Sequence, residues 1–324
     1  MHDPAGPVPI ATALWQEGPG RAALRYQPVG AGELLVETEF SGISRGTEAL
    51  VLAGRVPESE WHRMRCPFQE GAFPFPVKYG YAAVGRVVSG PGTGQRVFAL
   101  HPHQDRFALP ADSAVPLPED VPPARAVLAA NLETALNIVW DGAAAPGDRI
   151  AVVGAGVVGA LTGWLCARLP GAEVTLVDVN PSRAVLAAAL GCGFAAPGAA
   201  AGGCDLVIHA SASAAGLATA LGLAGEEARI VEASWFGDRA VALPLGAAFH
   251  SRRLRLVASQ VGAVPPERRA RWTRRRRLET ALRLLAAPEL DALISGETDF
   301  AALPARYGAI LDDPATLCHR IRYS

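Results

Sequence analysis

The spacing of hydrophobic and polar positions divides the chain into two regions of different character. Residues 20–118 hold short runs of strand-forming residues, such as 34–40 and 83–88, separated by clusters of glycine and proline. Many short strands with frequent turns are typical of a compact, barrel-like β domain. A proline pair at 122–123 ends this region, and apolar residues at helical spacing follow over 124–141. The first region is therefore predicted to be mostly β.

From residue 148 onward the pattern changes to apolar runs that alternate with helical stretches. The runs are short enough for strands buried on both faces, and short connections join them to the helices. Such alternation predicts a parallel, doubly wound α/β sheet. A further helix is predicted over 271–285, after a second proline pair. The other predicted elements are strands 149–153, 174–178, 205–209, 229–233 and 254–258 and helices 157–169 and 181–190.

Length and charge narrow the classes of protein to which the chain can belong. At 324 residues it is too long for one ordinary hydrophobic core, so about two domains are expected. The formal net charge of −1 gives no reason to expect a nucleic-acid or membrane partner. The arginine run 274–277 is interpreted as a solvated helix face near Glu279 rather than as a nucleic-acid patch. The sequence shows no secretory signal and no run long enough to span a membrane, which predicts a cytoplasmic protein.

The cysteines form no recognisable pattern. Their number is odd, and no two of them stand at CxxC spacing. A disulfide framework and a four-cysteine zinc lobe are therefore not expected. The five cysteines are Cys66, Cys166, Cys192, Cys204 and Cys318.

The most specific motif is the run 152–159, Val-Val-Gly-Ala-Gly-Val-Val-Gly. It follows a predicted buried strand and opens a predicted helix, and the next strand ends in Asp178. Asp178 lies 19 residues after Gly159 (178 − 159), close to the spacing of about 20 that is usual in dinucleotide-binding motifs. A glycine turn alone is weak support, but these four features together predict a nucleotide-binding turn.

Each position of this motif has a physical role. Gly154 permits the tight turn, Gly156 lets the backbone approach a pyrophosphate, and Gly159 lets the helix pack close to the strand. The N–H groups of Val157 and Val158, at the start of the helix, face the phosphates with the positive end of the helix dipole. The motif therefore predicts NAD or NADP as the cofactor.

Residues near the strand ends refine the choice of cofactor. Asp178 can accept hydrogen bonds from the ribose hydroxyls and would repel a 2′-phosphate, which favours NAD. Arg183 could accommodate that phosphate, so NADP stays possible. Ser211 and Ser234 follow two strands at the carboxyl edge and are predicted to contact the nicotinamide half. His209 lies within a strand and is interpreted as a core histidine.

Three segments resemble those of the medium-chain dehydrogenase/reductase superfamily, the alcohol dehydrogenase-like proteins. Residues 40–48 (FSGISRGTE) resemble the superfamily's catalytic segment G-I-C-R-S-D, and residues 79–87 (YGYAAVGRV) resemble its GHExxGxV segment. Residues 131–135 (NLETA) resemble the segment that carries the third zinc ligand. The segments SRGTE, PFQEG, PVKYGY, PHQ and CHRIRY are similar to the bacteriochlorophyllide a dehydrogenase branch.

The resemblance covers essentially the whole chain and implies its architecture. It implies a GroES-like β-rich catalytic domain over 1–124, completed by 267–324, and a Rossmann NAD(P)-binding domain over 125–266. It also implies a homodimer and a small-molecule substrate in the interdomain cleft.

The resemblance also shows where the zinc ligands of the superfamily are missing. The position of the ligating cysteine holds Ser44, that of the histidine Tyr81, and the acid after it is Ala82. The third ligand position falls at Ala130 or Asn131. Zinc binds thiolate, imidazole or carboxylate groups, so a catalytic zinc is not expected. A rearranged site formed by His101, Glu48 and Cys66 was the remaining alternative, although no spacing rule supports it.

Without zinc, hydrogen-bond donors must stabilise the developing alkoxide. Tyr81 is the candidate donor to the substrate oxygen, with a space-filling role as the alternative. Ser44 at the vacated ligand position and Thr47 near the superfamily's proton-relay hydroxyl are further candidates. Arg45 matches an arginine that contacts the pyrophosphate; a surface ion pair is the alternative.

Two carboxylates complete the candidate set. Glu48 and Glu133 are candidate bases or structural partners, and Thr134 beside Glu133 is a candidate cofactor contact. His101 and His103 are expected to alternate on a strand and so to point to opposite faces; packing or surface roles are favoured for both, with a general acid facing the cleft as the alternative for one of them.

These features together predict a zinc-independent, NAD(P)(H)-dependent oxidoreductase that interconverts a secondary alcohol and a ketone. A zinc-free quinone or enone reductase is the first alternative. A non-catalytic nucleotide-binding scaffold or sensor is the second.

Overall fold

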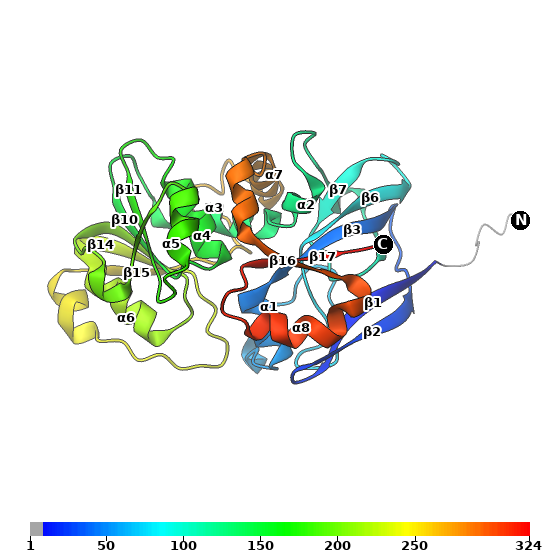
Figure 1. Ribbon diagram of the computed structural model, residues 1–324, viewed down its shortest axis with the longest axis horizontal. Helices are drawn as coiled ribbons and strands as arrows, with labels where there is room; N and C mark the ends of the chain where they lie inside the picture. The colour runs from blue at the N-terminus through cyan, green and yellow to red at the C-terminus, as the bar shows by residue number, and fades with distance from the viewer. Residues whose placement is uncertain (1–8) are drawn as a thin grey trace, which may run out of the picture. The chain divides into compact units, whose positions relative to one another are not determined.

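The computed structural model describes residues 9–324, which form two compact units. The β unit comprises the chain up to Ala130 together with Ile294–Ser324, and the α/β unit comprises Asn131–Leu293. In Figure 1 the β unit holds the blue, cyan and red segments, and the α/β unit holds the green and yellow ones together with the orange helix over residues 274–284. The C-terminal segment therefore returns to the unit in which the chain begins.

Two sheets form the β unit. Its strands are β1 (Ile10–Gly18), β2 (Arg21–Pro28), β3 (Leu34–Ser44), β4 (Glu70–Gly71), β5 (Val77–Lys78), β6 (Ala83–Ser89), β7 (Arg96–Ala99), β8 (Arg106–Leu109), β9 (Val115–Pro116), β16 (Ile294–Asp299) and β17 (Cys318–Arg322). One sheet has the order β2-β1-β5-β4, and the other has the order β16-β17-β3-β6-β7-β9, with β8 paired to β3. Only the β16–β17 pairing is parallel among those described.

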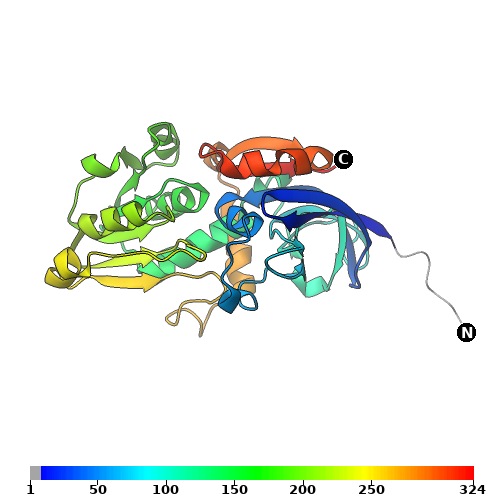
Figure 2. The same ribbon diagram turned by 90° about the horizontal axis from the view of Figure 1, so that it is seen from below.

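Short helices close the β unit. They are α1 (Arg45–Leu52), α2 (Pro123–Ala126) and α8 (Leu303–Asp312), with single turns η1 (Glu58–Glu60), η2 (Ala111–Ser113) and η6 (Phe300–Ala302). Helix α8, red in Figure 2, packs on the blue hairpin β1–β2. Leu14, Ile43 and Leu303 are buried together there, and each such side chain contributes roughly 1.5–3 kcal/mol when fully buried. This packing fixes α1, which follows β3 directly.

The α/β unit is a single parallel sheet with helices between its strands. Its strands are β10 (Arg149–Val153), β11 (Glu173–Val177), β12 (Gly193–Ala195), β13 (Cys204–His209), β14 (Ala224–Glu232) and β15 (Arg255–Ala258). Its helices are α3 (Ala129–Gly142), α4 (Val157–Cys166), α5 (Arg183–Ala189), α6 (Ala214–Leu223) and α7 (Arg274–Leu284), with single turns η3 (Pro197–Ala199), η4 (Leu245–Phe249) and η5 (Pro288–Leu293). The order β12-β11-β10-β13-β14-β15 is 3-2-1-4-5-6 in chain order, which is the Rossmann arrangement.

The predicted fold class is confirmed, with differences in detail. Every strand predicted in the second region is present, but β12 was not predicted because it has only three residues. The predicted helix 124–141 is two helices, α2 and α3. His101 and His103 lie between β7 and β8, not on a strand, so the predicted alternation is wrong. Within the described residues, no helix is both long and apolar enough to cross a membrane.

The division between the units differs from the predicted one at its second boundary. Residues 267–293 group with the sheet rather than with the β unit. Helix α7 explains this, because the guanidinium of Arg277 is 1% exposed and donates to the carboxylate of Glu133 at 3.0 Å. It also donates to the carbonyl oxygen of Val261 at 2.5 Å. Arg277 therefore does not belong to a solvated helix face, although Arg275 does pair with Glu279 at the surface as expected.

Candidate functional site

The glycine-rich turn joins β10 to α4, at the point where the strand order of the sheet reverses. Gly154 has a φ of +106°, and a Cβ there would meet the backbone nitrogen of Ser211 at 2.7 Å. A Cβ on Gly159 would meet the carbonyl oxygen of Gly154 at 1.9 Å. Packing within the protein therefore requires both of these glycines.

Gly156 differs from its two neighbours in this turn. Its φ of −72° and ψ of 179° are open to any residue, and apart from its two neighbours in the chain no residue has an atom within 4 Å of the position of a Cβ. The space adjoins the N-terminus of α4, where the N–H groups of Val157 and Val158 have no partner in a preceding turn of helix. A helix N-terminus attracts phosphate, and a missing Cβ leaves room for it. The turn therefore fits the pyrophosphate of a dinucleotide.

Asp178 lies beside the same turn, at the end of β11. Its Oδ2 accepts a hydrogen bond from the N–H of Ala155 at 2.7 Å, and its Oδ1 accepts one from the N–H of Asn180 at 2.8 Å. A carboxylate has about four acceptor positions, so it can still bind the two hydroxyls of a ribose. Arg183, the first residue of α5, is 9% exposed. The structure thus places the predicted acid at the turn and the arginine in a largely buried position.

Ser211 and Ser234 lie just beyond the carboxyl ends of β13 and β14, and a buried histidine links them. His209 Nε2 lies 2.7 Å from Ser211 Oγ, and His209 Nδ1 lies 2.7 Å from Glu232 Oε2. The N–H of Ser234 donates to Glu232 Oε1 at 2.7 Å. His209 is buried in its strand as expected, but it is also a partner of two polar side chains. Glu232 was not predicted, because a glutamate near the end of a strand has no distinctive sequence pattern.

In the β unit, three of the predicted catalytic residues come together. The phenol of Tyr81 is hydrogen-bonded to the side chains of Ser44 and Thr47. Burial raises the pKa of Tyr81 well above its usual value, and these two hydrogen bonds act against the shift. The phenol therefore stays protonated at neutral pH and can donate a hydrogen bond to an oxygen atom.

Glu48 is fully buried and supports this cluster through hydrogen bonds. It accepts hydrogen bonds from the N–H of Ser44 at 2.7 Å and from the hydroxyl of Tyr307 at 2.6 Å. Its Oε2 also lies 3.0 Å from His103 Nε2, and His103 Nδ1 lies 2.8 Å from Ser41 Oγ. These contacts use the carboxylate to hold the junction of β3 and α1. Tyr307 was not predicted, because it is 259 residues away in the chain.

The alternative metal site does not form. His101 stacks on Phe107 with ring centroids 3.9 Å apart, and burial lowers its pKa to about 3. Burial also raises the pKa of the Cys66 thiol to about 12. Across residues 9–324 no group of three or more His, Cys, Asp or Glu side chains could hold a metal ion. Ser44 and Tyr81 bond to each other, and they do not fit zinc.

Arg45 and Glu133 already have partners inside their own units. Arg45 Nε donates to the carbonyl oxygen of Leu311, in the last turn of α8, at 2.9 Å. Glu133 is 5% exposed and pairs with Arg277. Burial raises the pKa of Glu133, while the charge of Arg277 opposes the shift. The pairing with Arg277 gives Glu133 a structural partner, and its catalytic role stays a prediction; Thr134 follows it on α3.

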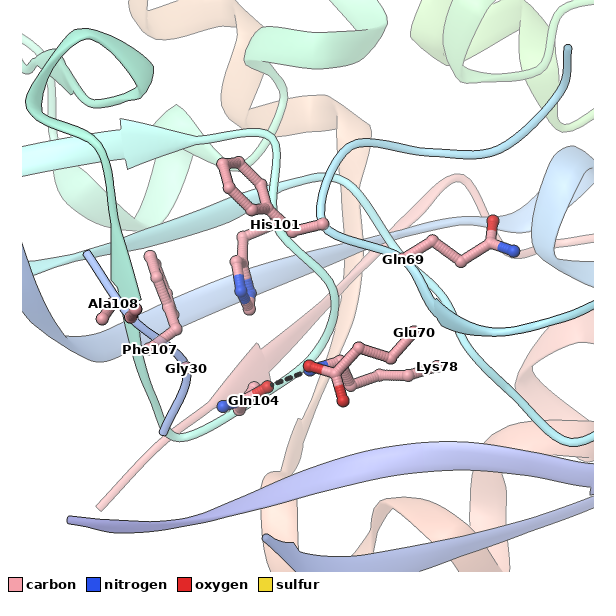
Figure 3. Close-up of a pocket in the computed structure, with 10 residues that line it drawn as sticks. Gly30, Gln69, Glu70, Lys78, His101, Gln104, Phe107 and Ala108 are labelled. Carbon is pink, nitrogen blue, oxygen red and sulfur yellow. Dashed lines mark hydrogen bonds and ion pairs between the residues drawn. The ribbon is translucent and has the colours of Figure 1, made fainter. Parts of the chain in front are cut away.

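A separate small pocket in the β unit is lined by none of the predicted catalytic residues. Figure 3 shows it between the His101–Phe107 stack and the polar side chains of Lys78 and Gln104. Its volume of about 210 Å³ is below the roughly 300–1,000 Å³ of most ligand sites. Lys78 is the one lysine of the sequence, is 1% exposed, and donates to Gln104 Oε1 at 2.6 Å and to Glu70. Burial lowers the pKa of Lys78.

The two units together define a class of fold. The β unit and the Rossmann sheet match the fold of solved dehydrogenase structures over nearly the whole chain. No protein-family model and no curated protein matches the sequence.

Solved structures match the chain over nearly its whole length. L-idonate 5-dehydrogenase from Escherichia coli K-12 has a TM-score of 0.79 at 16% identity, covering 97% of this chain and 98% of that one. A zinc-binding dehydrogenase from Sinorhizobium meliloti 1021, bound to NADP, has a TM-score of 0.77 at 20% identity, covering 97% and 99%. An alcohol dehydrogenase from Escherichia coli CFT073, complexed with NADH, has a TM-score of 0.76 at 16% identity, covering 97% and 99%. At these identities the likeness establishes the fold.

Proposed function

We propose that this protein is an NAD(P)(H)-dependent oxidoreductase that interconverts a secondary alcohol and a ketone without a catalytic zinc. The observation that carries the proposal is the open space at Gly156. Gly154 and Gly159 are explained by contacts inside the protein, whereas the space left by the missing side chain at Gly156 is open to a phosphate at the N-terminus of α4. Structural neighbours bound to NADP and NADH support a nicotinamide cofactor. The carboxylate of Asp178 favours NAD over NADP.

The nicotinamide ring, when bound, supplies or accepts the hydride. The phenol of Tyr81 donates a hydrogen bond to the substrate oxygen, which gains negative charge as the ketone is reduced. Its hydrogen bonds to Ser44 and Thr47 orient the phenol and can replace the proton that it gives up. In the oxidation direction the alcohol loses a hydride to the cofactor, and its proton passes through the hydroxyls of this cluster to water. These donors take the place that a Lewis-acidic metal has in zinc enzymes.

The first experiment is a titration of EDTA-treated protein with NADH and NADPH, followed by tryptophan fluorescence. We expect saturable binding of NADH with a lower Kd than that of NADPH. If neither nucleotide binds, the oxidoreductase proposal is wrong and a scaffold role gains support.

A second experiment tests the catalytic cluster. We expect Tyr81→Phe to lower kcat by about 10²–10³-fold on a secondary alcohol, with an unchanged Kd for NADH. Tyr26→Phe is the matched control, because Tyr26 is 81% exposed on β2. Undiminished turnover by Tyr81→Phe would refute the assigned role. Turnover of enones but not of simple ketones would favour the C=C reductase instead.

We also propose that the protein is a homodimer. Strand β15 is the outermost strand of the parallel sheet and leaves Leu256 36% exposed, so its edge is open to pair with another strand. Light scattering on purified protein would show twice the mass of one chain. A monomer at micromolar concentration would refute this proposal.

A further inference from the structure

Three side chains of the α/β unit have the hydrogen-bonded order serine, histidine, carboxylate. Ser211 Oγ lies 2.7 Å from His209 Nε2, and His209 Nδ1 lies 2.7 Å from Glu232 Oε2. The side chain of His209 has 0% exposure and that of Glu232 has 16%. Ser211 is partly exposed, so the buried imidazole of His209 joins a partly buried carboxylate to a hydroxyl that solvent can reach. This is the arrangement that activates serine nucleophiles in unrelated folds.

The direction of each hydrogen bond follows from the chemistry of the groups. An ionised carboxylate only accepts, so a neutral His209 must carry its proton on Nδ1, facing Glu232. Its Nε2 is then an acceptor, and the hydroxyl of Ser211 must donate to it. The N–H of Ser234 holds the other oxygen of Glu232 at 2.7 Å. The serine proton therefore points at the one nitrogen that can take it.

The surroundings of Ser211 suit an attacking oxygen. Helix α6 begins just after it, and the N–H of Gly216 donates to Ser213 Oγ at 2.9 Å. Ser213 Oγ in turn lies 3.1 Å from Ser211 Oγ. A Cβ on Gly216 would come within 2.2 Å of Ser211 Oγ and 2.9 Å of His209 Nε2, so only glycine leaves this pair intact. The positive end of the ten-residue helix α6 lies at the site and favours negative charge there.

We propose that Ser211 is a nucleophile activated by His209 and Glu232, and that it hydrolyses small acyl esters. His209 Nε2 takes the hydroxyl proton as Ser211 Oγ bonds to the acyl carbon. The ester C–O bond breaks, and the leaving alkoxide takes the proton from His209, which leaves an acyl-serine. Water then attacks the acyl carbon with His209 as base, releasing the acid and restoring Ser211. Glu232 stays ionised throughout and holds the Nδ1 proton.

This activity is distinct from the proposed hydride transfer and does not depend on it. Both use the carboxyl edge of the sheet, because Ser211 lies against Gly154 of the glycine turn. A bound dinucleotide would therefore cover the hydroxyl. We expect NADH to protect Ser211 from reagents in proportion to its occupancy.

A fluorophosphonate probe tests the nucleophile directly. Serine Oγ displaces fluoride from phosphorus, and the product remains attached for mass spectrometry. With the full-length protein we expect one addition per chain, located by peptide mapping at Ser211 and absent in Ser211→Ala. His209→Gln should slow labelling by on the order of 10²-fold or more, and circular dichroism would show whether it folds. Ser182→Ala is the matched control, because Ser182 is an exposed serine that bonds to Asn180.

The outcomes separate this inference from the proposed function. Two results together support the nucleophile. Labelling at Ser211 is preserved in Ser182→Ala, and hydrolysis of p-nitrophenyl acetate is lost in Ser211→Ala. Absence of labelling in a protein that binds NADH overturns the inference and leaves the oxidoreductase proposal standing. Labelling at Ser211 in a protein that binds no nucleotide supports the inference and overturns the oxidoreductase proposal. Labelling spread over several serines, unchanged in Ser211→Ala, also overturns it.

Discussion

Two alanine substitutions three residues apart should have opposite effects on stability. A side chain at one position would clash with the protein backbone, whereas a side chain at the other would enter the space proposed for a ligand. At Gly159 a Cβ would lie 1.9 Å from the carbonyl oxygen of Gly154. At Gly156 it would meet no protein atom within 4 Å, and the backbone there suits alanine. We therefore expect Gly159→Ala to lose stability, and Gly156→Ala to keep its stability and lose the nucleotide.

The magnitudes follow from these contacts. Relief of the clash at Gly159 requires α4 to move by more than 1 Å, to reach an ordinary carbon–oxygen separation of roughly 3 Å. Overpacking of this kind costs about 1–3 kcal/mol, which lowers Tm by about 2–12 °C in a unit of this size. Gly156→Ala should stabilise the fold by about 0.4–1 kcal/mol, because alanine restricts the unfolded chain. Its Kd for NADH should rise by about tenfold or more, since a methyl group would occupy the space for phosphate.

Differential scanning fluorimetry and a fluorescence titration with NADH measure both effects on the same samples. The wild-type protein and Gly198→Ala serve as controls, because a Cβ on Gly198 also meets no atom within 4 Å and its position is remote from the turn in sequence. If Gly156→Ala binds NADH as tightly as the wild type, the open space is not a phosphate site. If Gly159→Ala is as stable as the wild type, the packing of α4 on the turn is looser than described.

Three further predictions concern charge. Asp178→Ala should shift the ratio of Kd values toward NADPH by about tenfold, as measured by parallel titrations; an unchanged ratio would mean that Asp178 does not face the ribose. Burial lowers the pKa of His101 to about 3 from its ordinary 6.5, so the unfolded chain binds the proton first as pH falls. Urea unfolding should therefore show wild type losing about 1.6 kcal/mol more than His101→Phe between pH 6.5 and pH 5, and equal losses would contradict the burial argument. Glu133→Ala should lower the unfolding free energy by about 3–5 kcal/mol, because it leaves Arg277 buried without a counter-charge. The double variant Glu133→Ala, Arg277→Met should recover part of that loss, and no recovery would show that the pair is not the cause.

The sequence predicted those features that local patterns encode. The glycine turn, the strand before it and the acid at the end of the next strand are close together in the chain, so spacing alone indicated their arrangement. The β-rich region was likewise visible in its turns. Resemblance to a superfamily, rather than spacing, grouped Ser44, Thr47 and Tyr81 as candidates.

The features that the sequence did not predict depend on distant contacts. The environment of Glu48 is set by Tyr307 and His103, which belong to other parts of the chain. Residues 267–293 were predicted to complete the first unit. The buried guanidinium of Arg277, on α7, instead pairs with Glu133 on α3. These partners depend on which polar side chains are buried in the folded protein. A pattern of hydrophobic positions does not show that an arginine is buried. Glu232 was missed for the same reason.

The burial of Lys78 has a practical consequence for handling the protein. Lys78 is the one lysine of the sequence, and all the other residues of the Lys and Arg count are arginines. Glu70 and Gln104 bind the ammonium of Lys78 inside the protein. Amine-directed reagents such as N-hydroxysuccinimide esters do not react with guanidinium groups. In the folded protein they should leave Lys78 untouched, so labelling of this lysine would report the opening of this part of the β unit.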